Sequence, residues 1–188
     1  MTKSRIAFIM DPIQDVVVDK DTTFAFMLAA QTRGHEVWYL ELRDLFVERT
    51  CAMGHGRRTK VRRQAGHHFD FLEEANLPLS HFDAIFMRKD PPFNVAYLHA
   101  TQLLDLAQQD GTVVLNRPDG LRAANEKLYA LNFPSVIPAT LISADAIRLK
   151  NFLFELGGEM IIKPIDGHGG AGIFYIHEKD RNTNSIIE

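Results

Sequence analysis

The sequence of 188 residues predicts an α/β protein, with a doubly wound parallel-sheet domain followed by an incomplete α+β domain. Two observations predict this arrangement. Apolar runs typical of strands alternate with helical patterns up to about residue 118, as expected for βαβ units and a parallel sheet. After that point the elements become shorter and surround a glycine-rich loop. We therefore expect two domains, residues 1–122 and 123–188.

The first forty residues have the pattern of a strand, a helix and a second strand. Residues 5–10 form an apolar run that ends at an Asp-Pro pair, and residues 36–40 form another. Between them, Asp21 or Thr22 can cap a helix over residues 23–33. This order predicts two parallel strands joined by a right-handed crossover.

The same pattern returns later in the first domain. Residues 83–87 are apolar, Asn94 can cap a helix over residues 95–109, and residues 112–116 form the next strand. A second strand–helix–strand unit extends the predicted sheet.

The section from residue 48 to residue 68 is polar and weakly patterned, and we interpret its basic run as a solvated face or a mobile loop. Its basic run, residues 57–63, has no interleaved aromatic residues, which argues against a nucleic-acid site. His67 and His68 are adjacent, and no third ligand is spaced near them. We expect both at the surface rather than on a metal ion.

The second domain is expected to combine short helices with strands. Asn125 and Ser143 can cap its two predicted helices. The predicted elements are a helix over 126–133, a strand over 137–142, a helix over 144–156, and strands over 160–164 and 172–176.

Lys163 stands at the end of an apolar run, and a glycine-rich loop follows it. Glycine permits positive φ and lets backbone N–H groups approach a ligand, and an ammonium beside such a loop suits a polyphosphate. No Gly-Lys-Ser/Thr or helix pattern follows, so neither a Walker loop nor a dinucleotide fingerprint is indicated. A plain glycine-rich hairpin is the alternative. Lys127 is either a solvated helix lysine or part of the same anion site.

Two polar clusters directly follow predicted strands of the first domain, where ligands bind in open parallel sheets. One contains Asp11, and the other is Arg88-Lys89-Asp90. Arg88 can hold a carboxylate through two parallel N–H bonds. The alternative is a surface turn in which the charged residues of the second cluster pair with one another.

Composition limits the partners. A formal net charge of −3 gives no reason to expect nucleic acid or an anionic membrane. No stretch approaches the roughly 18 apolar residues that span a bilayer, and the first apolar run is too short for a signal peptide. A single cysteine, Cys51, excludes an internal disulfide and fits a reducing compartment. We expect a soluble cytoplasmic protein.

Five short segments carry a resemblance to a known family: MDPI at 10–13, KDTTF at 20–24, MRKDPPF at 87–93, NEKLY at 125–129 and KPIDG at 163–167. They occur in the order found in bacterial glutathione synthetases, which are ATP-grasp ligases. The chain resembles that family over nearly its whole length, most weakly between about residues 48 and 75. The resemblance implies a pre-ATP-grasp domain followed by an incomplete ATP-grasp domain.

The resemblance implies a ligase that joins γ-glutamylcysteine to glycine and splits ATP to ADP and phosphate, with Mg2+ as cofactor. The cysteine carboxylate would attack the γ-phosphate to give an acyl phosphate, which the glycine amine then attacks. Protein groups would mainly position the reactants and neutralise charge.

The resemblance also implies roles for individual residues. Arg88 is the catalytic candidate and, together with Asp11, Lys89 and Asp90, would hold the dipeptide or the acyl phosphate. The loop over residues 166–172 would fold over the ATP phosphates and exclude water. The candidates for binding ATP are Lys127, Lys163, Asp166, Gly167, Gly169, Gly170, Ala171 and Gly172.

Members of that family are longer than this chain, so the resemblance implies that the later part of the ATP-grasp fold is missing. We expect the magnesium ligands in that part and none in this chain, and a homotetramer for the complete enzyme. The chain alone is expected to be inactive, with an exposed apolar face and unpaired strand edges. The alternatives are a non-catalytic fragment or binding module, or half of a split ATP-grasp enzyme. Another ATP-grasp ligase would share the glycine loop but not the Arg88 segment.

Overall fold

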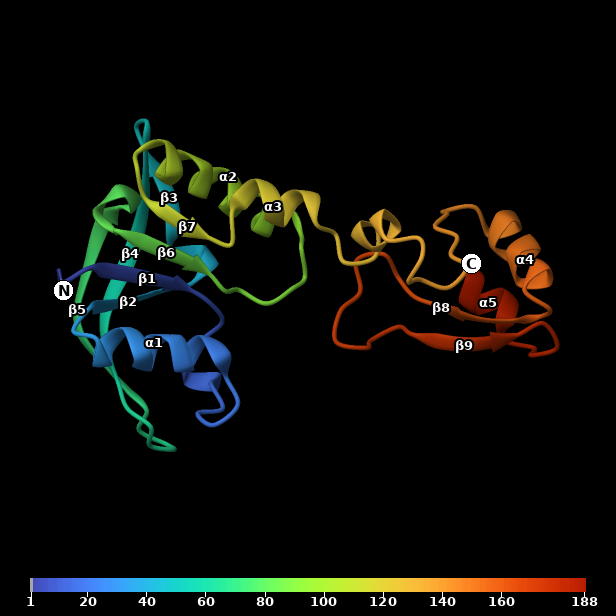
Figure 1. Cartoon of the computed structure of the whole chain (residues 1–188), viewed down its shortest axis with the longest axis horizontal. Coiled ribbons are helices and arrows are strands. Elements are labelled where there is room, and N and C mark those ends of the chain that lie inside the picture. The colour runs from blue at the N-terminus through green and yellow to red at the C-terminus, as the bar shows by residue number, and fades with distance from the viewer. Residues whose placement is uncertain (1) are drawn as a thin grey trace. The chain divides into compact units, whose positions relative to one another are not determined.

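A computed structural model describes residues 2–188, which divide into two compact units (Figure 1). The first unit reaches to Ala124, and the second runs from Asn125 to Glu188. Among the described residues, no helix is both long and apolar enough to cross a membrane.

The first unit is built on one mixed sheet. In the part of the chain that the structure describes, the sheet has seven strands in the order β3-β4-β2-β1-β6-β7, with β5 paired to β4. Strand β1 pairs in parallel with β2 and with β6, β6 pairs in parallel with β7, and β4 runs antiparallel to its neighbours. The strands are β1 Arg5–Ile9, β2 Glu36–Leu40, β3 Leu45–Glu48, β4 Cys51–Val61, β5 Phe69–Pro78, β6 Ala84–Met87 and β7 Val113–Leu115.

Helices cover both faces of this sheet (Figure 1). Helix α1, Thr22–Thr32, packs Phe24 and Met27 on one face, and α2, Val95–Gln109, packs Leu104 on the other. Successive residues of β1 point to opposite faces, so neighbouring side chains of one strand belong to two separate cores. The predicted doubly wound α/β class is confirmed. A short helix that we did not expect, α3 (Pro118–Ala123), follows β7.

The mobile-loop interpretation of the basic run is wrong, because residues 57–61 belong to β4, which pairs with β5 as a hairpin. The buried positions of β4 alternate, at residues 52, 54 and 56, and a bulge between Arg58 and Thr59 shifts the alternation. Glycines occupy two of these inward positions because Leu40 and Trp38 pack against them. The alternation therefore did not stand out as apolar residues in the sequence.

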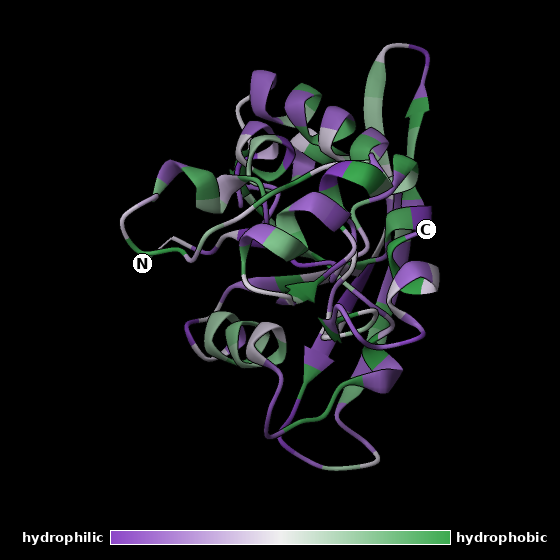
Figure 2. Cartoon of the chain, turned by 90° about the vertical axis from the view of Figure 1, so that its right-hand side faces the viewer, coloured by the Kyte–Doolittle hydropathy of each residue, from purple (hydrophilic) through white to green (hydrophobic). Residues whose placement is uncertain are grey.

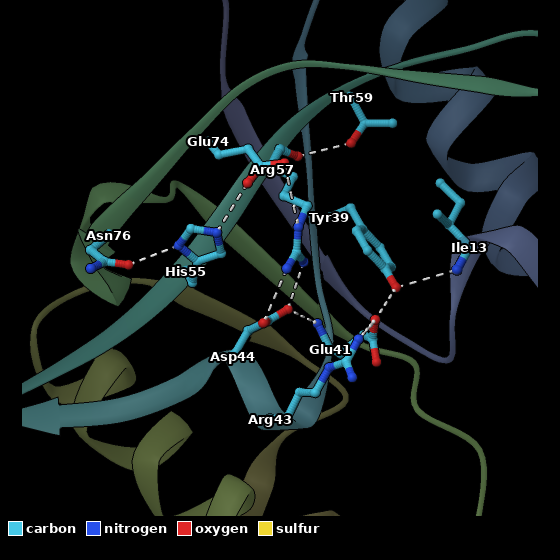
Figure 3. A network of polar contacts seen from close by, with 10 residues as sticks. All are labelled: Ile13, Tyr39, Glu41, Arg43, Asp44, His55, Arg57, Thr59, Glu74 and Asn76. Carbon is cyan, nitrogen blue, oxygen red and sulfur yellow. Dashed lines mark hydrogen bonds and ion pairs between the residues drawn. The ribbon is translucent and has the colours of Figure 1, made fainter.

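Three arginines of the basic run, Arg57, Arg58 and Arg62, pair with acidic residues, whereas Lys60 and Arg63 are exposed. Arg57 forms a two-bond ion pair with Asp44, with Nη1 to Oδ2 at 2.8 Å, and Asp44 is 8% exposed (Figure 3). The hydrogen bond to Asp44 raises the pKa of Arg57. Arg58 pairs with Glu73 at 3.0 Å. Cross-strand pairing thus neutralises side chains that the sequence alone showed only as a positive run.

The prediction for His68 is also wrong. Its side chain is 7% exposed, and its Nε2 donates to the carbonyl oxygen of Ile13 at 2.7 Å. His67 is exposed, as expected. The β4–β5 turn folds back over the segment that follows β1, a long-range contact that no local pattern reveals.

The second unit is smaller and has a core of Leu153, Ile176 and Ile187. Its sheet has two antiparallel strands, with Ile162 opposite Phe174. The predicted strands around the glycine loop are confirmed with slightly shifted bounds. The elements are a 3₁₀ turn at Tyr129–Asn132, α4 Ala146–Glu155, β8 Glu159–Ile162, β9 Phe174–His177 and α5 Thr183–Ile187.

Three local predictions in the second unit are wrong. No strand forms over residues 137–142 among the described residues, because the segment finds no pairing partner and Pro138 lacks an N–H group. The predicted helix over 126–133 shrinks to a turn and the Tyr129–Asn132 3₁₀ segment. Asp145 caps α4, with its carboxylate accepting from the Ile147 and Arg148 amides. The expected Ser143 instead accepts from the Asp145 amide.

The expected exposed apolar surface is present in the second unit. Figure 2 colours the chain by the hydropathy of each residue. Each strand of its sheet also has one unpaired edge. Large apolar side chains that are at least 60% exposed are Val136, Ile147, Phe154, Ile161 and Tyr175.

We expect Arg57→Met to lower the free energy of unfolding of the first unit by about 3 kcal/mol, because it leaves Asp44 buried without its cation. Trp38 is the only tryptophan in the sequence and is 2% exposed, so its fluorescence in urea reports this unit. The control is Arg117→Met, which breaks an exposed pair with Asp119 and should leave the free energy of unfolding nearly unchanged. Equal effects of the two substitutions would contradict the role of the buried pair.

Candidate functional site

The two polar clusters that follow β1 and β6 lie side by side. These strands are parallel neighbours with Ile9 opposite Met87, so both chains leave the sheet at the same edge. The amide of Arg88 continues the pairing by donating to the carbonyl of Ile9 at 2.7 Å. The juxtaposition follows from the rule that parallel strands end together.

A cleft of about 310 Å³ opens at this edge of the sheet. Its lining comes from three places: the end of β1 and the segment after it, the start of α1, and the segment after β6. The lining residues are 10–12, 15–16, 20–23, 88 and 90. Asp11, Arg88 and Asp90 from our predicted set are among them.

Arg88 lies at the N-terminus of α1. Its Nε donates to the hydroxyl of Thr23 at 3.1 Å and its Nη2 to that of Thr22 at 3.0 Å. The guanidinium carbon also lies 5.9 Å from the ring centre of Phe26. Within residues 2–188 no carboxylate forms an ion pair with Arg88. A half-buried cation beside helix amides favours a bound anion.

Asp11 joins the two clusters. Its carboxylate accepts from the Lys89 ammonium at 2.8 Å and from the Asp90 amide at 3.0 Å. Lys89 also donates to the Asp90 carbonyl. The surface-turn alternative is therefore not what forms, because Lys89 pairs with Asp11 of the other cluster and no ion pair joins two of the described residues 88–90. Lys89 is half-buried and does not line the cleft, whereas Arg88 lines it.

Five polar lining residues were missed as site residues: Asp15, Lys20, Asp21, Thr22 and Thr23. We used residues 20–24 only as a helix start and as one of the segments that carry the resemblance. The helix start is correct, since the Asp21 side chain accepts from the Phe24 amide at 2.7 Å. The signal that would have found these residues is the parallel βαβ order, which brings the N-terminus of the crossover helix to the edge where β1 ends.

The cleft offers charges of both signs. Carboxylates at 11, 15, 21 and 90 stand with the cations of Lys20 and Arg88. A ligand with both an ammonium and a carboxylate group would find partners for each. The arrangement suits an amino acid or a short peptide better than a purely anionic or apolar molecule.

In the second unit, the glycine-rich loop connects β8 to β9. Its residues from 163 to 173 are exposed except for half-buried Gly167. Gly169, Gly170 and Gly172 have φ values of 60°, 83° and 71°, which L side chains rarely adopt. At Gly167 the reason for glycine is different, because a Cβ there would lie 2.5 Å from the ring of Pro164.

Lys127 lies against this loop. Its Nζ donates to the carbonyl of Gly167 at 2.6 Å and to the carboxylate of Glu126. Asn125 connects the Lys127 segment to the loop, since its Oδ1 accepts from the Lys127 amide and its Nδ2 donates to the carbonyl of Ile165. The structure thus places Lys127 beside the loop, 40 residues away in sequence.

Cationic groups gather around the loop. The pKa of Glu126 is lowered, mainly by its hydrogen bond from Lys127, with smaller contributions from His168 and Lys163. Lys163 itself is exposed and directly follows β8. The exposed glycines and the neighbouring ammonium groups fit a ligand that carries phosphate.

The described residues contain no cluster of side chains that would by itself enclose a metal ion. Among residues 2–188, no three His, Cys, Asp or Glu side chains come close enough together to hold a metal ion. Magnesium prefers carboxylate and other oxygen ligands. We therefore assign no step to a metal held by this chain.

Family models match both units. The N-terminal domain of prokaryotic glutathione synthetase matches residues 5–122, and the ATP-grasp domain of the same family matches residues 126–188. The chain belongs to the prokaryotic glutathione synthetase family. It is also similar to named glutathione synthetases: 40% identical over 184 residues to that of Shewanella oneidensis, 41% to that of Vibrio cholerae and 40% to that of Escherichia coli K12.

The alignments cover 98% of this chain but 58% of each relative. Among solved structures, a RimK domain ATP-grasp protein from Sphaerobacter thermophilus is similar, with a TM-score of 0.60 at 15% identity over 98% of this chain and 57% of that one. D-alanyl-alanine synthetase A from Vibrio cholerae has a TM-score of 0.57 at 14% identity over 100% and 56%. These likenesses support the fold, and the family model over residues 126–188 assigns the second unit to an ATP-grasp domain.

Proposed function

We propose that this chain carries the substrate cleft and part of the nucleotide site of an enzyme that makes glutathione, in domains 1–122 and 123–188. The observation that supports this most is the combination of both family matches with a cleft where Arg88 faces a mixed set of charges. The reaction joins γ-glutamylcysteine to glycine. The cysteine carboxylate attacks the γ-phosphorus of ATP, ADP leaves, and the glycine amine then displaces phosphate from the acyl phosphate.

The cleft of the first unit would hold the dipeptide. γ-Glutamylcysteine has one ammonium and two carboxylate groups, which match the charges of both signs that line the cleft. Arg88 would hold a carboxylate or the acyl phosphate and is the proposed catalytic residue. Asp90 would contact the ammonium, while the Asp11–Lys89 pair keeps the two segments together.

The second unit would hold ATP. We propose that Lys127, Lys163 and the loop over residues 166–172 contact the phosphates. The Lys127 ammonium has three N–H donors, and Gly167 and Glu126 engage two of them, which leaves one for a phosphate oxygen. The exposed loop would close over the phosphates and exclude water from the acyl phosphate.

The chain spans 58% of the length of the curated relatives that it matches. The later part of the ATP-grasp domain in those relatives has no counterpart in the alignment. We propose that the magnesium complex of ATP is the true substrate, that its metal ligands are not among residues 2–188, and that the complete enzyme is a cytoplasmic homotetramer. The alternative function is a binding module for the dipeptide or nucleotide.

Arg88→Ala is expected to raise the Kd of γ-glutamylcysteine at least about tenfold, because a charge-assisted pair contributes about 1.5–3 kcal/mol. The Kd of ATP should not change. Isothermal titration of the chain with each ligand measures both values. Arg117→Ala, an exposed arginine in the same unit, is the control. An unchanged dipeptide Kd for Arg88→Ala would remove this residue from the site.

Lys163→Ala is expected to show the opposite pattern. It should raise the Kd of ATP by about tenfold and leave dipeptide binding alone, since one phosphate contact is lost. Lys179→Ala, which removes an exposed lysine of the same unit, serves as control. A normal ATP titration would refute the assignment of Lys163 to the nucleotide site.

The chain alone is expected to release no ADP in the presence of ATP, magnesium, γ-glutamylcysteine and glycine. The assay omits each substrate in turn. Release that requires both amino-acid substrates would establish the ligase and overturn our expectation of inactivity. Binding of dipeptide and ATP without release would support the binding module for this chain.

A further inference from the structure

Ile13 is held from two sides by buried side chains. It is fully buried, lies two residues beyond Asp11 and begins a 3₁₀ turn, Ile13–Asp15, in the segment that walls the cleft. Its N–H donates to the hydroxyl of Tyr39 at 3.3 Å, and its carbonyl accepts from Nε2 of His68 at 2.7 Å. Both backbone groups of one residue are thus bound by side chains from distant parts of the chain.

Tyr39 comes from β2 and is itself fixed. Its hydroxyl donates to a carboxylate oxygen of Glu41 at 2.9 Å, which leaves the oxygen lone pairs to accept from Ile13 (Figure 3). Its ring stacks on that of Phe71 at 5.8 Å, with the Arg57 guanidinium carbon 5.7 Å from the ring centre. Burial, followed by the Glu41 hydrogen bond, raises the pKa of Tyr39, so the hydroxyl keeps its proton.

His68 comes from the β4–β5 turn. Its ring lies between two aromatic rings, 5.5 Å from that of Phe24 and 5.0 Å from that of Phe69. Because Nε2 faces a carbonyl oxygen, the ring hydrogen must be on this nitrogen for the hydrogen bond to form. The aromatic packing fixes the direction in which His68 donates.

The segment that Tyr39 and His68 hold through Ile13 has a cavity on each side. Asp15 and Val16 line the substrate cleft, and Val16 also lines a second hollow of about 620 Å³ between this segment and the β4–β5 turn. Residues 16–19 line this hollow on one side, while Val16 and Val18 pack against the core with their side chains. A segment that is packed on only one side depends more strongly on the hydrogen bonds that hold its end.

We propose that Tyr39 and His68 are positioning residues that set the Asp11–Val16 wall of the substrate cleft through Ile13. The proposal rests on the proposed function, because it makes dipeptide binding depend on two side chains that do not line the cleft. Neither residue touches the substrate. They act through the backbone of the wall, in the way that supporting hydrogen bonds hold a binding group in its productive position.

Tyr39→Phe and His68→Leu each remove one hydrogen bond to Ile13 and keep an apolar side chain of similar size. Both are expected to raise the Kd of γ-glutamylcysteine about fivefold in titrations of the full chain, as one buried hydrogen bond would. Amide hydrogen exchange over residues 11–16 should become faster. His68→Gln, which can donate to the same carbonyl, should restore both values.

His81→Leu is the matched control. This half-buried histidine packs against Trp38 and Phe82 in the same unit and does not line the cleft. It should change neither dipeptide binding nor exchange over residues 11–16. Trp38 fluorescence in urea shows whether each variant remains folded, and Tyr39→Phe carries the test if His68→Leu does not fold.

Two readouts separate this inference from the proposed function. Folded variants with the wild-type dipeptide Kd and unchanged exchange would overturn the inference, as would a failure of His68→Gln to differ from His68→Leu. If the wild-type chain does not bind the dipeptide, the proposed function fails for this cleft. Faster exchange in Tyr39→Phe would then still support positioning of the wall by these residues, and unchanged exchange would refute it.

Discussion

Parallel pairing of β1 with β2 and β6 is the constraint on which the site of the first unit depends. With Ile9 opposite Met87, the chain leaves both strands at the same edge, so Asp11 and Arg88 must lie close together. The α1 crossover starts at that edge as well, which brings Thr22 and Thr23 within hydrogen-bond distance of Arg88. The strand order therefore determines where the cleft forms. Its charges come from the segments after β1 and β6 and from the start of α1.

The β4–β5 hairpin extends the parallel sheet on the far side of β2. Its inward glycines admit Leu40 and Trp38, and its arginines pair with carboxylates of the neighbouring elements. The Arg57–Asp44 pair favours this arrangement of the strands, because separating the two charges would leave Asp44 buried without its cation. That arrangement places the β4–β5 turn, with His68, behind the segment that walls the cleft. The β4–β5 turn, which is far from residue 13 in sequence, thus forms a hydrogen bond with the backbone of the segment that lines the cleft.

In the second unit, the candidate site is held by hydrogen bonds more than by buried side chains. Its glycine loop and Lys127 are brought together by hydrogen bonds to the loop backbone, while the loop itself stays exposed. In the proposed function, this exposed loop would admit phosphate and close over it. Around it, apolar side chains such as Ile161 and Tyr175 remain exposed on a two-stranded sheet. Hydrogen bonds thus hold Lys127 and Asn125 against the loop, in a unit whose buried core is small.

The sequence by itself determined the α/β class, both βαβ units, the glycine loop and the residues after β1 and β6, because each rests on local periodicity, capping or turn chemistry. It did not reveal the hairpin, because three of the five inward positions of β4 are glycine or threonine, or the absence of a strand at 137–142. Only the tertiary structure decided that His68 is buried and that Lys89 pairs with Asp11 while Arg88 faces the cleft. Those outcomes depend on contacts between residues tens of positions apart, which strand order and packing select and local pattern cannot.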